Sequence, residues 1–190
     1  DRDPNRIQVF ANNELQYGIA SSGNGPSRFR DPIDIAVGPA GFVYVLDKAG
    51  PALRIFGRDG AFVREVQILQ SLPDPVSIAI DGDGTILIAS SSNAGRVYTF
   101  PPFHEIPWTG TMSTQGFAVA ATGKAGAVAS DATGISLILD TEDRRLWGGQ
   151  RIEPDQASLA RPLYGGIGTG RGSFRSPVDI TFTPERDVLI

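Results

Sequence analysis

Two aspartates share the same local sequence and are the residues of this chain best placed to do chemistry. Asp34 lies in the sequence P-I-D-I at residues 32–35, and Asp179 lies in P-V-D-I at residues 177–180. Two carboxylates that face one cavity could bind a cation or a cationic ligand there. The structural alternative is that each one accepts hydrogen bonds from backbone N–H groups of its own turn, as Asp readily does. The structural interpretation is favoured, and the ligand site is kept as a hypothesis.

Other candidate sites have fewer of the parts that they need. His104 is the only histidine, so a Ser-His-Asp triad or a multi-histidine metal centre cannot be assembled, and a structural or surface role is expected. The sequence D-G-D-G at residues 81–84 resembles the start of a calcium loop. Position 12 of such a loop needs a bidentate Glu, and Ser92 stands there. A hairpin turn is therefore expected at 81–84, and calcium is the only cofactor that the acidic residues leave open.

The composition limits the classes of partner. Lys and Arg number 17 against 21 Asp and Glu, for a net charge of −4, and no run of basic residues forms a stripe. This balance disfavours a nucleic-acid partner. No apolar run approaches the roughly 18–20 residues of a membrane helix. The chain has no cysteine and hence no disulfide framework or thiolate site, which suits an exported protein, although many cytosolic proteins share the trait.

An internal repeat predicts the elements that must position these residues. The sequence FRDPIDIAVGPAGFVYVLD at 29–47 recurs as FRSPVDITFTPERDVLI at 174–190, and each copy follows a glycine pair at the same distance. A third copy, PDPVSIAIDGDGTILIA, spans 73–89, with its second proline 43 residues after the proline of the first copy. A degenerate fourth copy, QGFAVAATGKAGAVA, is assigned to 115–129.

Each copy has the layout of antiparallel strands joined by tight turns. In the first copy a turn at 38–41 separates apolar segments at 33–37 and 42–46, and further apolar segments lie at 54–56 and 61–66. Four short strands at this spacing form one blade of a β-propeller. The predicted fold class is therefore all-β, a propeller of four-stranded antiparallel blades.

The repeat alignment also predicts where the two aspartates lie. Asp34 and Asp179 occupy equivalent positions at the start of the innermost strand, which lines the mouth of the central channel of a propeller. In this alignment Ser77 and Phe117 take the same position in the other two copies. The two carboxylates are therefore expected to face the channel at the same end.

The repeat resembles the NHL repeat, which forms six-bladed propellers. The resemblance rests on P-I-D-I-A-V at 32–37, on G-F-V-Y-V-L-D at 41–47 and on Arg54-Ile55, and D-R-D-P-N-R-I-Q-V-F at 1–10 resembles the second half of the same repeat. About four repeats are visible. Because propellers with this architecture carry unrelated activities, the resemblance implies the fold and leaves the function open.

The first and last residues carry complementary halves of one repeat. The expected division is 174–190 plus 1–16, then 29–70, 73–113 and 114–163, so that the two ends would share one blade and remove the exposed sheet edges. Under the alternative, further blades or another chain complete the propeller. The alternative is favoured, because closure with four blades is rare.

The function that these features favour is that of a non-enzymatic recognition or scaffold module for a macromolecule, most often a protein. Segments 101–113 and 141–163 break the repeat period, and such departures map to loops that carry binding. Trp108 and Trp147 lie in these segments and are candidate anchors for the partner. The alternative is a calcium-dependent lactonase or esterase of the six-bladed class that uses Asp34 and Asp179.

Overall fold

The computed structural model describes residues 6–19, 27–49, 52–67, 72–92, 96–105, 115–118, 123–149, 161–166 and 170–190. This part of the chain is built almost wholly from β-strands, as predicted. Its one helical element is a 3-10 turn, Phe103–Glu105. Within these residues, no helix has the length and apolar character that crossing a membrane requires.

Three complete blades follow one another along the chain, and each is an antiparallel sheet whose strand order is the chain order. The first blade consists of β3 (Pro32–Val37), β4 (Val43–Asp47), β5 (Ala52–Phe56) and β6 (Phe62–Gln67). The second consists of β7 (Pro75–Ile80), β8 (Ile86–Ser90), β9 (Arg96–Phe100) and β10 (Gln115–Ala118). The third consists of β11 (Ala125–Ser130), β12 (Ser136–Asp140), β13 (Arg145–Gly149) and β14 (Arg161–Gly165).

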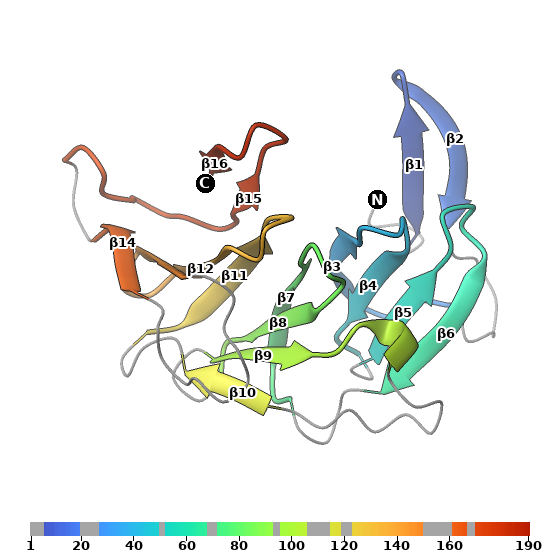
Figure 1. Ribbon diagram of the computed structural model, residues 1–190, viewed down its shortest axis with the longest axis horizontal. Helices are drawn as coiled ribbons and strands as arrows, with labels where there is room; N and C mark the ends of the chain where they lie inside the picture. Colours follow the sequence, from blue (N-terminus) through green and yellow to red (C-terminus); the bar gives the residue numbers. More distant parts are fainter. Residues whose placement is uncertain are drawn as a thin grey trace.

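The blades stand side by side in an open arc (Figure 1). Their first strands are neighbours, because β3 packs against β7, β7 against β11, and β11 against β15 (Thr181–Phe182). A two-stranded sheet lies at each end of the arc, β1 (Ile7–Ala11) with β2 (Glu14–Ile19) at one end and β15 with β16 (Val188–Leu189) at the other. The first strands therefore line the inner side of the arc.

Two expectations about the repeat are corrected by this arrangement. The fourth copy was expected to begin near Gln115, but residues 115–118 form the outer strand of the second blade, and the next inner strand is β11. The described parts of residues 174–190 and 1–16 also do not share a sheet. β15–β16 and β1–β2 form separate sheets at opposite ends of the arc, and residues 1–5 lie outside the described part.

Apolar side chains from neighbouring blades meet to form the core. Their burial is the main force that holds the blades together, at about 25 cal/mol for each Å² removed from water. The largest cluster joins the first and second blades, and smaller ones join the second to the third and the third to β15. The first cluster includes Tyr44, Leu46, Ile55, Ile78, Ile80 and Ile88.

A buried carboxylate at the end of β4 closes the first blade. Asp47 is fully buried and accepts hydrogen bonds from the backbone N–H groups of Arg30, Asp31 and Ala49 at 2.8 to 3.2 Å. The guanidinium of Arg54, itself buried, pairs with the same carboxylate at 2.5 Å and with Glu65 at 2.8 Å. Arg54, which belongs to the repeat motif, thus has a structural role in this blade.

Asp140 plays the same role in the third blade, where no arginine pairs with it among the described residues. Asp140 ends β12 as Asp47 ends β4, and it accepts hydrogen bonds from the backbone N–H groups of Lys124, Glu142 and Asp143. In both blades one buried acid fixes the segment that leads into the first strand, and in this way it sets the position of the residues on that strand.

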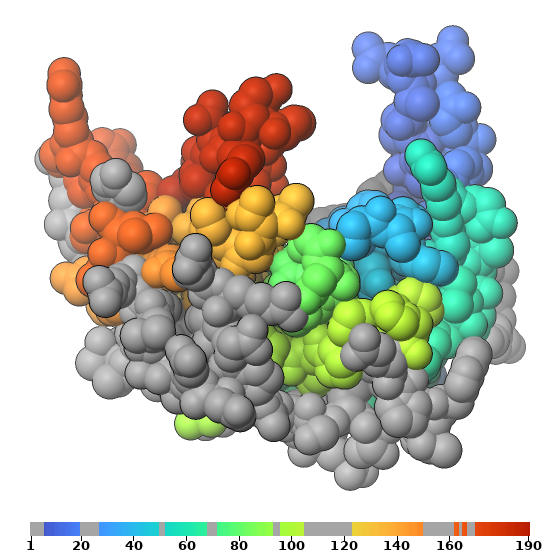
Figure 2. All heavy atoms as spheres, viewed as in Figure 1, coloured from blue at the N-terminus to red at the C-terminus, as the bar shows by residue number. Residues whose placement is uncertain are grey.

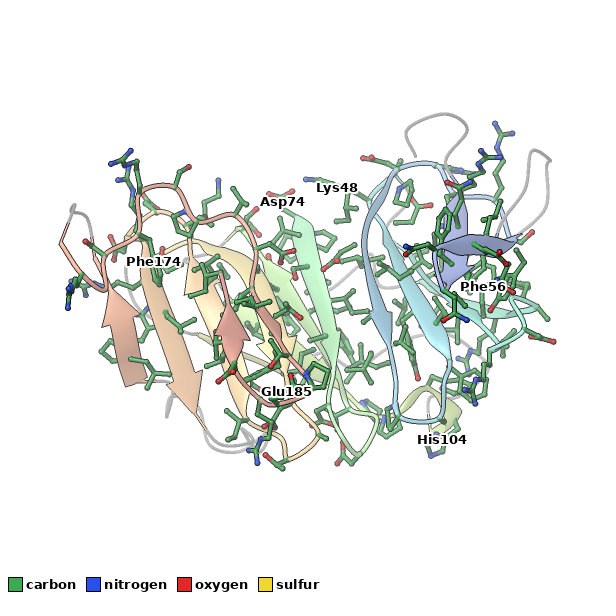
Figure 3. All side chains as sticks on the ribbon, turned by 90° about the horizontal axis from the view of Figure 1, so that it is seen from above. Lys48, Phe56, Asp74, His104, Phe174 and Glu185 are labelled. Atoms are coloured by element: carbon green, nitrogen blue, oxygen red, sulfur yellow. The ribbon has the colours of Figure 1, made fainter. Side chains whose placement is uncertain are left out.

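Replacing Asp47 with Ala should destabilise the protein strongly, because it removes the acceptor of three backbone N–H groups and the buried carboxylate with which Arg54 pairs. Breaking a buried ion pair in this way costs about 3 kcal/mol or more. The neighbouring Lys48–Asp74 pair is largely exposed (Figure 3) and joins the two charged groups at 2.7 Å. Lys48→Ala is the matched control and should cost less than about 1 kcal/mol. Urea denaturation followed by circular dichroism measures both values, and equal losses would contradict the assignment.

Candidate functional site

The inner strands present one residue each at the same place on the inner side of the arc. A register shift occurs between Pro32 and Asp34 in β3, and the same shift recurs in β7 and β11. The shift sets the position of the following side chain. The residues at this position are Asp34, Ser77, Ala127 and, from the sequence match, Asp179.

Phe117 was expected at this position and does not occupy it. It belongs to β10, the outer strand of the second blade, and Ala127 stands there instead. A signal for the correct register was present in the sequence. The turn D-A-T-G at 131–134 matches D-G-D-G at 81–84, but the longer distance between these copies concealed the match.

The polar side chains at this position accept hydrogen bonds from backbone N–H groups on the edges of the inner strands. Asp34 Oδ1 accepts from the N–H of Ile35, and its Oδ2 accepts from the N–H of Ile78 in the next blade, both at 2.8 Å. Ser77 Oγ likewise accepts from the N–H of Val128 in the blade after that, at 3.2 Å. These side chains therefore connect each blade to the next.

Asp179 follows only half of this pattern. Its Oδ1 accepts from the N–H of its own neighbour, Ile180, at 2.8 Å. Ala127 in the preceding blade has no polar side chain that could serve this N–H group. The second oxygen of Asp179 has no hydrogen-bond partner among the described residues, and the side chain is exposed.

Both carboxylates line a single cavity of about 210 Å³ on the inner side of the arc. Ser77 and the backbone of β7, β11 and β15 complete its wall. The structure thus brings Asp34 and Asp179 together at one cavity, and each carboxylate also accepts a hydrogen bond from the N–H group of the residue that follows it. A ligand site there stays a prediction.

Burial raises the pKa of the Asp34 carboxyl above its ordinary value, and the negative charge of Asp179 raises it further. Hydrogen bonds from the Ile78 N–H, the Ser77 hydroxyl and the Ile35 N–H oppose this rise without cancelling it. Asp179 is therefore the carboxylate of the pair that is exposed to the cavity and available to a ligand.

The arrangement offers one exposed carboxylate oxygen beside hydroxyl and backbone groups. Within the described residues, no group of three or more His, Cys, Asp or Glu side chains is placed to hold a metal ion. The exposed carboxylate oxygen of Asp179 can pair with a cationic group in the cavity. Whether it takes calcium stays a prediction.

The acidic turn at 81–84 is a hairpin turn between β7 and β8, as expected. Asp81 Oδ1 accepts from the N–H groups of Asp83 and Thr85, and Gly84 N–H donates to the Asp81 carbonyl. Burial, and next the nearby Asp83 carboxyl, raise the pKa of Asp81 to about 6. Two carboxyl groups are thus held close together in this turn.

In the equivalent turn of the third blade the buried aspartate pairs with an arginine. The guanidinium of Arg186, in the β15–β16 turn, donates a hydrogen bond from Nε to Asp131 Oδ2 at 3.0 Å, and its NH2 group forms an ion pair with the same oxygen at 2.9 Å. Burial acts to raise the pKa of Asp131, but the hydrogen bonds from Thr133 and Ile135 and the charge of Arg186 together lower it. In the second blade, the residue equivalent to Arg186 in the next turn is Gly134, so Asp81 has no such partner. No motif in the sequence indicated this Asp131–Arg186 pair between blades.

The remaining candidates lie far from the cavity or outside the described residues. His104 is exposed in the 3-10 turn, with its ring 5.9 Å from that of Phe103, and Figure 3 shows it at the rim opposite Lys48 and Asp74. Phe103 packs against Phe42 with ring centroids 4.6 Å apart. The described part of segment 101–113 is thus attached to the first blade, which fits the expected structural role.

The two tryptophans give no complete test of the predicted anchors. Trp108 lies outside the described residues. Trp147 belongs to β13, so the segment expected to be irregular at 141–163 contains a regular strand. Its indole is half-buried against the core between the second and third blades, and the buried Nε1 has no hydrogen-bond partner among the described residues. This placement favours packing, and a role as a partner anchor stays a prediction.

Comparisons with known proteins reveal the architecture. No protein-family model matches the sequence, and no curated protein matches it. Among solved structures, a streptogramin B lyase matches with a TM-score of 0.62 at 14% identity over 97% of this chain and 54% of that chain. A functionally unknown protein from Desulfotomaculum acetoxidans gives 0.60 at 17% identity over 93% and 52%. A putative gluconolactonase gives 0.56 at 18% identity over 90% and 58%.

The fold is that of a β-propeller. At these identities the likeness shows the fold alone. The chain spans between half and three fifths of the length of these structures, so its arc corresponds to about half of a propeller ring.

Replacing Asp81 with Asn should stabilise the protein at neutral pH, because Asn can still accept from Asp83 and Thr85 but carries no charge. The folded-state pKa of Asp81, about 6, lies above its ordinary value of 3.8. The wild type therefore loses stability relative to the variant as pH rises from about 4 to about 6. Solvent at the turn screens part of the repulsion, so the variant should be more stable by roughly 1–2 kcal/mol at pH 7.5 and about equal at pH 4.

Asp131→Asn is the matched control and should act in the opposite direction. It loses its pairing with Arg186, so it should be less stable than the wild type at pH 7.5, with a difference that shrinks in acid. Urea unfolding at both pH values measures the two variants. An Asp81→Asn variant that is no more stable than the wild type at pH 7.5 would show that the two carboxyls do not repel.

Proposed function

We propose that the chain is a non-enzymatic recognition module, built from NHL-type repeats, that binds a protein partner at the cavity between its inner strands. The observation that carries this proposal is the contrast between the two carboxylates. Asp34 uses both oxygens to hold backbone N–H groups, whereas Asp179 is exposed and keeps one oxygen without a partner among the described residues. One is used for structure, and the other is presented to a ligand.

The surroundings of Asp179 suit a basic side chain. Val178 beside it is 78% exposed, and the cavity wall is formed largely by polar groups of the inner strands. Lys and Arg carry an aliphatic stem that packs on apolar surface and a charged head that pairs with a carboxylate. A partner that presents one such residue from a loop therefore fits the cavity better than a neutral ligand does.

The resemblance to NHL repeats supports a role in recognition, but it does not identify the partner. The repeat motif falls on the structural unit, since P-I-D-I-A-V is β3 and V-Y-V-L-D is β4. A rigid blade array with connecting loops is a platform on which binding residues differ freely while the framework is kept.

A calcium-dependent hydrolase of the lactonase or esterase type is the second candidate. The observation that favours it is the same cavity, where Asp34 and Asp179 meet on the inner side of the arc. Two of the structures with this fold are titled as a lyase and a putative gluconolactonase. Such a site would need ligands beyond these two carboxylates to fill the six to eight positions around calcium.

Binding of a short peptide tests the proposal. A blocked Leu-Arg-Leu peptide should shift the backbone amide signals of Ile35, Ile78 and Ile180 in two-dimensional NMR, and a citrulline peptide of the same shape should not. Asp179→Asn should raise the dissociation constant of the arginine peptide about tenfold, since a hydrogen bond to a charged group contributes about 1.5–3 kcal/mol. Glu142→Gln removes an exposed acid from another turn and should leave binding unchanged.

Two outcomes would contradict the proposal. Equal affinity for the arginine and citrulline peptides would show that the charge is not recognised, and unchanged binding by Asp179→Asn would place the site elsewhere. A parallel titration with calcium chloride separates the second candidate. Calcium shifts at these amides that disappear in Asp179→Asn, together with hydrolysis of a simple lactone, would favour the hydrolase.

A further inference from the structure

The side chain at the repeat position joins the first blade to the second and the second to the third. Asp34 accepts a hydrogen bond from the N–H of Ile78 at 2.8 Å, and Ser77 accepts one from the N–H of Val128 at 3.2 Å. Both donors lie on the inner strand of the next blade, directly after its own residue at the repeat position. Each bond therefore fixes the inner strand that follows.

The third blade has no such bond to the strand that carries Asp179. Its residue at the repeat position is Ala127, and a methyl group accepts no hydrogen bond. The N–H of Ile180, which corresponds to those of Ile78 and Val128, is held by Asp179 itself. Ile180 still packs into the apolar core beside the third blade. Apolar packing is not directional, so this contact alone does not fix the orientation of the strand.

Arg186 stands where the corresponding turns of the three complete blades have glycine. Gly41, Gly84 and Gly134 have φ of 81°, 92° and 82°, and each donates its N–H to the carbonyl of the first residue of its turn. Arg186 has a φ of 69° and donates to the carbonyl of Thr183 in the same way. Glycine adopts this left-handed conformation more readily than arginine does. The side chain of Arg186 must therefore offset an unfavourable backbone conformation.

The guanidinium of Arg186 makes a contact that glycine cannot make. Its Nε donates to Asp131 Oδ2 and its NH2 group donates to the Thr133 hydroxyl, both at 3.0 Å. Asp131 follows β11 directly, and only 5% of its side chain is exposed. A hydrogen bond between a guanidinium and a carboxylate is strong and directional. It ties the β15–β16 turn to the inner strand of the third blade.

The short strand β15 is therefore held at both of its ends. Ile180 precedes it and packs into the core, and Arg186 lies in the turn that follows it. β15 packs against β11, and Figure 2 shows the β15–β16 segment (red) standing against the third blade (yellow to orange). Rotation of this strand about the apolar contact would move Asp179, the neighbour of Ile180, relative to the cavity. The bond from Arg186 opposes that rotation and uses neither oxygen of Asp179.

We propose that Arg186 is a positioning residue for Asp179, and that its bond to Asp131 replaces the link between blades that Ala127 cannot make. Asp34 has to hold both its own neighbour and the next blade, which occupies both of its oxygens. In the last repeat the linking role passes to Arg186, so one oxygen of Asp179 stays open. The inference rests on the proposed function for its binding measurement only, since the placement of the strand requires no ligand.

Replacing Arg186 with Gly tests the proposal, because the variant has the residue found in the other three turns and loses only the bond to the third blade. Hydrogen exchange at the Ile180 amide reports the placement of Asp179, which holds this N–H. The Ile180 amide should exchange about tenfold faster or more, whereas the Ile78 amide, held by Asp34, should keep its protection. The dissociation constant of the arginine peptide should rise towards the value expected for Asp179→Asn.

Two further variants separate loss of this pair from a change of charge. Asp131→Asn removes the carboxylate from the other side of the pair and should have the same effects as Arg186→Gly. Arg171→Gly removes an equal charge from an exposed position before β15 and should leave both exchange and binding unchanged. Circular dichroism checks that each variant is folded.

Ala127→Ser restores the missing link and tests the replacement directly. Ser77 shows that a serine at the repeat position reaches the N–H of the next strand. Combined with Arg186→Gly, Ala127→Ser should slow the exchange of Ile180 again and recover the affinity for the arginine peptide. A residue that served only the general stability of the fold would not be rescued at this one position.

Four results would overturn the proposal. They are unchanged exchange of Ile180 in Arg186→Gly, an equal loss of protection at Ile180 and Ile78, no rescue by Ala127→Ser, and faster exchange with an unchanged affinity for the peptide. A wild type that does not bind the peptide would contradict the proposed function instead. The exchange measurements would still decide whether Arg186 holds Asp179 in place.

Discussion

The structure depends on how the N–H groups on the edges of the inner strands are satisfied. Each inner strand pairs with only one neighbour in its own sheet, so every second backbone N–H on its other edge points away from that sheet. An unsatisfied buried N–H costs about 1–3 kcal/mol. The chain meets this need with the side chain at a single repeat position, and Asp34 and Ser77 each hold an N–H of the next blade. The same bonds fix the distance between blades and the shape of the cavity.

This constraint explains why the candidate site consists of these residue types. An acceptor is needed at the repeat position, and Asp, with two oxygens, can serve two N–H groups while Ser serves one. Where the position is Ala127, Asp179 of the next strand accepts from the N–H of its own neighbour, and its second oxygen has no partner among the described residues. The structural acceptor Asp34 and the proposed binding group Asp179 therefore occupy equivalent positions, and they differ because of the residue at this position in the preceding blade.

Much of the fold could be predicted from the sequence, because turns and alternating apolar residues recur at a nearly constant distance. The repeat also explains why Asp34 and Asp179 line one cavity, since equivalent repeat positions occupy equivalent places. The third blade was misaligned because its inner strand, A-G-A-V-A-S, lacks the proline and the large apolar residues of the other copies. The Asp131–Arg186 pair could not be foreseen, because it joins two turns 55 residues apart that only the packing of blades brings together.

The central claim is that side chains at the repeat position connect the blades, and hydrogen exchange measures this connection directly. In Asp34→Ala the amide of Ile78 should exchange about tenfold faster or more, while the amide of Val128, held by Ser77, should keep its protection. In Ser77→Ala the pattern should reverse. Unchanged protection of Ile78 in Asp34→Ala, or equal loss at both amides in either variant, would show that these bonds do not hold the blades together.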